Sequence, residues 1–167
     1  MQYFPTKAQL IKNFSICNNW EEKYIYIMEL GRLLPKFPNN LKQQKYQISG
    51  CQNKTWIALI LTKQNNRIQD TAIQNTPSIK LYGDSDSAIV KGIIAIIFNL
   101  YKGRNLEEII HVDVTTFLIN QLQLKQNLTI SRSQGIFLIL RSIHSQADEL
   151  LHQKIYSSNI KAILKII

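Results

Sequence analysis

The chain has 167 residues, 45% of them hydrophobic and 19% charged, a balance that suits one globular domain with a hydrophobic core. Its most apolar stretch, residues 93–100, is bounded by Lys91 and Lys102 and is too short to cross a bilayer. The N-terminus lacks the charged start and apolar run of a signal peptide, so we expect a cytoplasmic protein.

The formal net charge of +9 does not by itself indicate a nucleic-acid partner. The 15 lysines and 5 arginines are scattered along the chain, whereas nucleic-acid binders usually carry a basic stripe with interleaved aromatic residues. The 27 isoleucines and 14 asparagines, together with the lysines, are typical of an AT-rich coding genome. We therefore expect neither nucleic acid nor membrane among the partners.

Two capping patterns predict helices near the N-terminus. Thr6-Lys7-Ala8-Gln9 reads as a capping box that opens a first helix, with Cys17 on its buried face. Asn19 is expected to cap a second helix, which ends near Gly31 or Pro35.

Two β-type runs follow a polar loop, at residues 55–62 and 78–82. The first run is apolar on both faces, which suits a strand covered on both sides. Asn65-Asn66 is a hairpin signal, because asparagine tolerates the positive φ of tight turns. The intervening residues, to about 78, extend the hairpin or form an insertion.

The rest of the sequence predicts helices. Asp84 or Ser85 is expected to cap a long central helix that is apolar almost all round. A short helix is expected over residues 113–122. Ser131-Arg132-Ser133-Gln134 reads as a second capping box, opening a long helix that breaks at residues 157–159.

The elements together predict an α+β fold, with a small antiparallel sheet of about three strands packed with several helices. We expect residues 1–156 to form a single domain and residues 157–167 to be a C-terminal extension.

Cys17 and Cys51 are the two cysteines, and two distant thiols in a cytoplasmic protein argue against a structural disulfide. They are too few for a zinc or iron–sulfur site, and His111, His144 and His152 show no spacing with them that would complete one. We expect no metal and no cofactor, and we expect His144 and His152 to lie on the surface.

Cys51 carries the functional interpretation. It lies in Gln47-Ile48-Ser49-Gly50-Cys51-Gln52-Asn53-Lys54-Thr55-Trp56-Ile57, a polar loop that opens onto an apolar strand. Thiol chemistry depends on access and on the thiolate fraction, so a loop cysteine is a better nucleophile candidate than a core cysteine. A single loop cysteine is nevertheless more often a bystander, so this motif alone does not settle a function.

Further motifs accompany the cysteine loop: Asn19-Trp20-Glu21-Glu22-Lys23-Tyr24, a block from Gly83 to Gly92, and Ser131-Arg132-Ser133-Gln134-Gly135. In this order they resemble the SufE family of sulfur-acceptor proteins over residues 4–147. The resemblance implies a SufE/IscU-like sandwich. It also implies that Cys51 takes sulfur from the persulfide of a SufS-type cysteine desulfurase, a pyridoxal-phosphate enzyme, and so forms a transient persulfide itself.

The resemblance further implies that the chain stimulates the desulfurase and delivers the sulfur to a SufBCD-type scaffold complex. It would be a sulfur carrier rather than an enzyme, and we expect a homodimer. Transfer at sulfur needs no metal, general acid or oxyanion hole in the acceptor.

Several residues are candidates for supporting the cysteine loop or for binding the partner. Gly50 gives the loop backbone freedom, Gln52 follows Cys51, and Trp56 is a candidate wall that shields the thiol. Asp84 and Asp86 suit helix capping better than a general acid/base pair, and the resemblance places Asp86 near the partner-facing surface.

Arg132 at a helix start is unfavourable for the helix dipole, which suggests another use. It could pair with Asp84 or Asp86, contact the desulfurase, or remain solvated.

Three alternatives to the SufS partnership stay open. One is a CsdE-type acceptor for a paralogous desulfurase. Another is a cysteine hydrolase, which would need one of the three histidines within hydrogen-bond reach of Cys51. The third is a cluster-building scaffold, for which one reactive cysteine supplies too few ligands.

The chain departs from the resembled family in two lengths. The region at residues 65–78 is longer than the family usually shows, and the chain continues past the family's usual end near Ala147.

Overall fold

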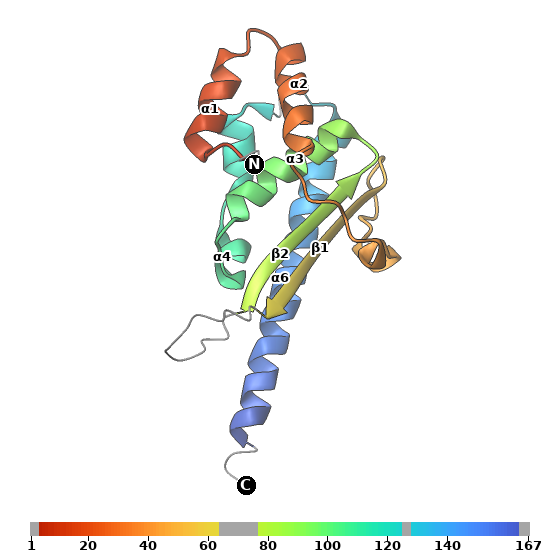
Figure 1. Ribbon diagram of the computed structural model, residues 1–167, viewed down its shortest axis with the longest axis vertical. Helices are drawn as coiled ribbons and strands as arrows, with labels where there is room; N and C mark the ends of the chain where they lie inside the picture. The colour runs from red at the N-terminus through yellow and green to blue at the C-terminus, as the bar shows by residue number, and fades with distance from the viewer. Residues whose placement is uncertain (1–3, 64–76, 125–127, 164–167) are drawn as a thin grey trace.

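The computed structural model describes residues 4–63, 77–124 and 128–163, with side chains as far as Tyr156 (Figure 1). Its elements, in chain order, are α1 (Lys7–Ile16), α2 (Trp20–Gly31), the short turns η1 (Asn39–Leu41) and η2 (Gln44–Tyr46), β1 (Thr55–Lys63), β2 (Pro77–Ser85), α3 (Ala88–Tyr101), α4 (Leu106–His111), α5 (Val114–Thr116), the π-helical turn η3 (Phe117–Gln121) and α6 (Ile130–Ile163).

The sheet is a two-stranded antiparallel hairpin in which Thr55 of β1 faces Ser85 of β2 and Lys63 faces Pro77. Gln47 adds a single antiparallel bridge to Trp56. The α+β class is confirmed. In the described residues the sheet has two strands and this bridge, instead of about three strands. The Asn65-Asn66 turn and most of the 65–78 insertion lie outside the described residues.

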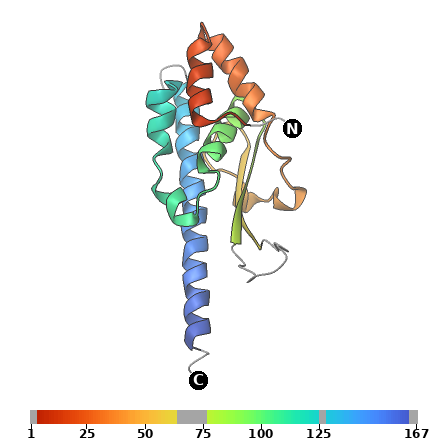
Figure 2. The ribbon, with the colours of Figure 1, turned by 60° about the vertical axis from the view of Figure 1, so that its left-hand side comes forward.

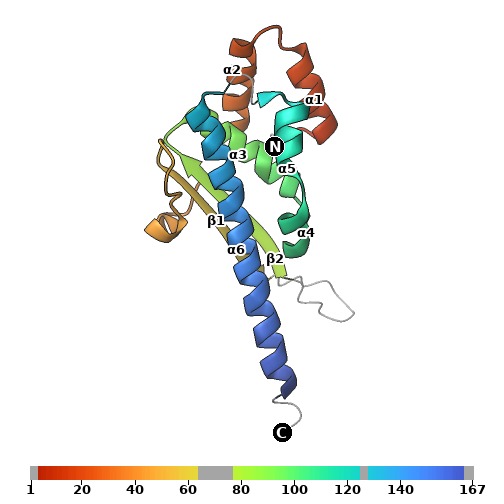
Figure 3. The same ribbon diagram turned by 180° about the vertical axis from the view of Figure 1, so that it is seen from behind.

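Helices α3 and α6 pack on the hairpin, with α2 against α3 and α4 against α6. Seen from behind, α6 crosses the back of both strands (Figure 3). The core lies between these layers, and α3 supplies its centre with the fully buried run Ile93, Ile94, Ile96 and Ile97. This confirms the prediction of a central buried helix, because a helix covered on several sides is apolar around most of its circumference.

Two of the predicted helix starts are confirmed. Thr6 and Gln9 form the expected capping box at α1. The side chain of Asn19 accepts a hydrogen bond from the Glu22 amide and caps α2. Cys17 follows α1 as its C-cap and is half-buried, so it lies at the end of the helix rather than on its buried face.

Two other predicted starts are wrong by a few residues. Asp84 and Ser85 belong to β2, whose pairing with β1 continues through Ser85, and Ser87 caps α3 instead. Helix α6 begins at Ile130, where the Thr129 hydroxyl accepts from the Arg132 amide at 3.4 Å. Ser131 is therefore inside the first turn of α6, and its hydroxyl is used elsewhere.

Helix α6 continues to Ile163, so the break predicted at residues 157–159 is wrong. Relative to alanine, each serine or asparagine lowers the stability of a helix interior by only about 0.5 kcal/mol. The second half of α6 projects away from the rest of the molecule (Figures 1 and 2). Within the part of the chain that the structure describes, none of the helices has the length and apolar character needed to cross a membrane.

Candidate functional site

The loop that carries Cys51 is fixed at both ends to the start of β1. The Ile48 amide donates to the Thr55 carbonyl at 2.8 Å, and the Thr55 hydroxyl donates to the Asn53 carbonyl at 3.2 Å. Between these points Gly50 has φ of 83°, in the left-handed region that side chains disfavour. The loop turns at Gly50, as expected, and the next residue presents its thiol.

Cys51 lies at a small pocket between its own loop and helices α3 and α6. The apolar walls are Val90 and Ile93 from α3 and Ile136 and Ile139 from α6; the remaining lining residues are Gln52, Asn53, Thr55, Ser131, Arg132 and Gly135. A Cβ atom placed on Gly135 would lie 3.7 Å from the Cys51 Sγ, so the sulfur rests against bare helix backbone.

Partial shielding of Cys51 by apolar neighbours is thus confirmed, but the predicted wall is wrong. Trp56 is absent from the lining of this pocket. Successive side chains of a strand point to opposite faces, so Trp56 points away from the face that Thr55 presents to Cys51. The Lys42 ammonium lies 4.7 Å from the Trp56 ring centroid on that other face.

Burial in the pocket raises the pKa of the Cys51 thiol above its ordinary value. Because the thiolate is the reactive form, the resting protein holds its sulfur mainly as a less reactive thiol. Access and deprotonation are therefore both limited by the same apolar contacts.

Alkylation of Cys51 by iodoacetamide should require a higher pH in the folded protein than in the same protein unfolded in urea. A raised pKa lowers the thiolate fraction at every pH below it, so the native rate–pH profile lies to the alkaline side. Mass spectrometry of the Cys51 peptide across a pH series measures this separately from Cys17. Coincident profiles would contradict a shielded thiol.

Gln52 joins the cysteine loop to α6. The Ser131 hydroxyl donates to the Gln52 Oε1 at 3.0 Å, and both residues are exposed. This bond links the residue beside Cys51 to the first turn of the helix that supplies half of the pocket wall.

Replacing Ser131 with alanine should speed the alkylation of Cys51 in the native protein about two- to fivefold. Loss of one neutral hydrogen bond releases the loop from α6 by roughly 0.5–1 kcal/mol. The measurement is the iodoacetamide rate at fixed pH. Ser145→Ala, an exposed serine further along α6, is the control and should leave the rate unchanged. A Ser131→Ala rate equal to that of the control would show that the bond does not hold the loop.

Asp84 has a structural role away from the thiol. Its carboxylate pairs with the Lys91 Nζ at 2.8 Å and the Lys42 Nζ at 3.1 Å. Partial burial by itself would raise the pKa of Asp84, but hydrogen bonds and charge from the two lysines outweigh it and hold the pKa below its usual value. Asp84 therefore ties the loop at Lys42 and helix α3 to β2.

The predicted pairing of Arg132 with Asp84 or Asp86 is not found; in the described chain Arg132 forms no ion pair. Arg132 lines the Cys51 pocket instead. Asp86 is exposed, and its amide donates to the Lys54 carbonyl at 3.1 Å, which attaches the end of the cysteine loop to the β2–α3 turn. Neither acid lines the pocket, which removes the basis for a general acid/base pair there.

All three histidines lie in the described part of the chain, and none lines the Cys51 pocket. His111 and His152 are exposed and interact within their own helices. His144 is half-buried 3.0 Å from the Tyr101 hydroxyl, so its predicted surface position is wrong. The cysteine-hydrolase alternative therefore lacks a histidine base at the Cys51 pocket.

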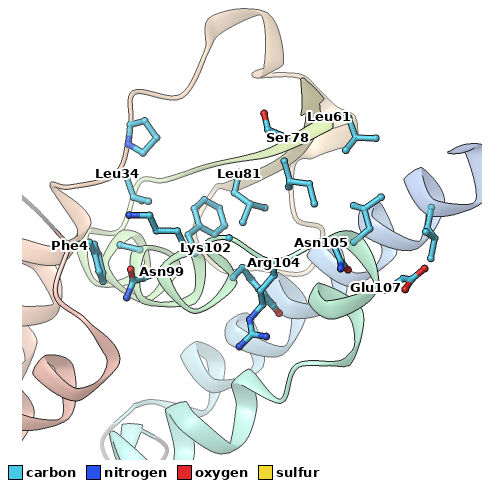
Figure 4. A pocket seen from close by; sticks show the side chains of 18 of the residues that line it. Phe4, Leu34, Leu61, Ser78, Leu81, Asn99, Lys102, Arg104, Asn105 and Glu107 are labelled. Carbon is cyan, nitrogen blue, oxygen red and sulfur yellow. The ribbon is translucent and has the colours of Figure 1, made fainter. Parts of the chain in front are cut away.

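A larger cavity of about 820 Å³ lies elsewhere, between the open end of the hairpin at Leu61 and Ser78, the α3–α4 turn at Lys102 and Arg104, and Leu34 (Figure 4). Cys51 is not part of it. Across the described residues, no three histidine, cysteine or acidic side chains gather as metal ligands would. The thiol at the small pocket is thus the chemically distinctive group.

Comparison with known proteins adds the decisive observation. Residues 8–147 match the SufE family model, described as an Fe-S metabolism associated domain. The chain belongs to the SufE family. It is 46% identical over 151 residues to the cysteine desulfuration protein SufE of Wigglesworthia glossinidia brevipalpis. The aligned region covers 90% of this chain and 96% of that protein. The resemblance of the motifs is confirmed, and the SufE family connects the chain with sulfur transfer in iron–sulfur metabolism.

Proposed function

We propose that this protein is a sulfur carrier that takes persulfide sulfur from a SufS-type cysteine desulfurase onto Cys51, stimulates that enzyme and delivers the sulfur to a SufBCD-type scaffold. The observation that carries the proposal is the place of Cys51. It is a lone thiol on a loop that turns at a left-handed glycine, in a pocket that holds no histidine or acid.

The transfer is a displacement at sulfur. The Cys51 thiolate attacks the outer sulfur of the donor's persulfide, a new S–S bond forms to Cys51, and the bond inside the donor's persulfide breaks. The donor cysteine leaves as a thiolate, so charge and oxidation state balance without an added electron acceptor. The acceptor contributes a positioned nucleophile, which suits a carrier rather than an enzyme.

The residues around Cys51 have separate parts in this proposal. Gly50 lets the loop swing, and Gln52 holds it closed through Ser131. Arg132 lines the pocket, and we assign it to contact with the desulfurase. Asp84 and Asp86 keep the β2–α3 turn and the end of the loop in place.

The resting contacts also suggest how the donor acts. Because burial disfavours the thiolate, docking must withdraw Cys51 from Ile136 and Val90 before attack. Sulfur is then accepted only at the donor's surface. We infer a cytoplasmic protein that works as a homodimer; a CsdE-type partnership with a paralogous desulfurase is the alternative.

Incubation with a cysteine desulfurase, pyridoxal phosphate and cysteine tests the proposal. The Cys51 peptide should gain about 32 Da, the mass of one sulfur transferred to a thiolate. Comparing SufS-type and CsdA-type enzymes in this assay distinguishes the two partnerships. A Cys51 peptide of unchanged mass with both enzymes would refute the carrier role.

A further inference from the structure

The first half of α6 exposes two large apolar side chains close to the Cys51 pocket. Ile130 is 80% exposed and Phe137 is 61% exposed. They are seven residues apart, so they share one helix face two turns apart. Ile130 directly precedes Ser131, which lines the Cys51 pocket. These exposed side chains have no part in the sulfur chemistry itself.

Behind Phe137 is an apolar pocket of about 90 Å³ between α6 and the α5–η3 segment, which runs alongside the first turns of α6 (Figure 2). Leu118, Ile119, Leu124 and Leu140 are among its walls. Its dimensions suit a single aliphatic side chain. Ile136 lines this pocket and the Cys51 pocket alike, so the two share a wall.

The charge around this surface is positive. Residues 129–147 include Arg132 and Arg141 and no acidic residue. Neither arginine forms an ion pair in the described chain. A second copy of this chain that used the same segment would add two more arginines and no acidic residue to the contact, which opposes that contact. A partner with acidic side chains around an apolar one would be attracted instead.

We propose that Ile130, Phe137 and the pocket behind Phe137, which we call the α6 patch, form a docking surface for the sulfur-donating desulfurase. The partner places one apolar side chain in the pocket and acidic side chains against Arg132 and Arg141. The inference rests on the proposed function, because a donor that reaches Cys51 must cover the start of α6. An apolar anchor in a pocket with a charged rim is the usual source of interface affinity.

The test is the affinity for the holo-form of the organism's own cysteine desulfurase, measured by isothermal titration calorimetry. Phe137→Asp should weaken binding at least about tenfold, because it removes an apolar anchor and brings a like charge to the acidic partner. Phe137→Leu keeps the apolar character and should stay within about threefold of wild type. Ile155→Asp, on the projecting half of the same helix and 52% exposed, is the matched control and should bind normally.

Further measurements distinguish a failure of the docking proposal from a failure of the carrier proposal. Circular dichroism and the native alkylation rate of Cys51 should be unchanged in Phe137→Asp, because Phe137 is not part of the Cys51 pocket. Equal affinity of Phe137→Asp and wild type, with persulfide still formed on wild-type Cys51, would overturn the docking surface alone. Absence of persulfide on wild-type Cys51 would overturn the carrier function. Loss of wild-type self-association in Phe137→Asp, with unchanged desulfurase affinity, would assign the patch to a second copy and also overturn the proposal.

Discussion

The Cys51→Ser variant should accept no sulfur, with no mass gain of about 32 Da after incubation with desulfurase and cysteine. Serine places an oxygen where the sulfur lies, and a hydroxyl of this kind neither ionises near neutral pH nor forms a stable bond to a sulfane sulfur. The fold should survive, because Cys51 is half-buried on a loop and its loss leaves the walls at Ile93 and Ile139 in place. Stability should fall by no more than about 1 kcal/mol.

Cys17→Ala is the matched control, because it removes the chain's other thiol. The Cys17 thiol donates to the Asn13 carbonyl at 3.3 Å at the end of α1 and does not line the Cys51 pocket. This variant should accept sulfur as well as wild type does. Sulfur uptake by Cys51→Ser would contradict Cys51 as the acceptor. Loss of uptake in Cys17→Ala, with the fold intact, would show that Cys17 takes part in the transfer.

Two short capping signals near the N-terminus predicted local structure well. The caps at Thr6 and Asn19 are found as expected, because a cap depends only on a short side chain and the amides that follow it. The continuous apolar run of α3 likewise predicted a buried helix. The central element of the fold was therefore readable from the sequence.

Two predicted helix starts failed because tertiary contacts decide the role of the side chain, whereas the break predicted at residues 157–159 failed because serine and asparagine cost a helix little. Asp84 resembles a helix cap, but β1 extends its pairing through Ser85 and Asp84 binds two lysines instead. Ser131 resembles a second cap, but its hydroxyl donates to Gln52, far away in the sequence. A capping pattern cannot reveal that a distant partner competes for the same side chain.

The candidate site likewise has one part that a local motif predicts and another that depends on packing. One motif marked Cys51 and Gly50 as candidates, because the turn and the thiol are neighbours in the chain. The walls at Val90 and Ile136 come from two helices that reach the loop only through packing, and no local signal marks them. Strand alternation shows that Thr55 and Trp56 face opposite sides, but not which side the loop covers. Trp56 was therefore chosen wrongly.

Gly92→Ala should destabilise the protein by at least about 2 kcal/mol, because overpacking at a fixed backbone contact costs more than helix propensity returns. A Cβ atom on Gly92 would lie 1.9 Å from the Ile27 carbonyl oxygen and 2.5 Å from its carbonyl carbon. On the α2 side, a Cβ on Gly31 would lie 2.8 Å from the Gly92 nitrogen. The two helices cross with their backbones in contact, so α2 must move away from α3. Urea unfolding followed by circular dichroism measures the loss.

Gly135→Ala is the control for this change, since Gly135 also lies within a long helix. Its new Cβ would meet the Cys51 Sγ at 3.7 Å, an ordinary contact, and nothing closer. Alanine should then stabilise α6 by up to about 1 kcal/mol through its better helix propensity. The two substitutions share their chemistry and differ only in the space available, so their effects should have opposite signs. Equal stabilisation by both would mean that α2 does not rest on α3 as closely as this structure describes.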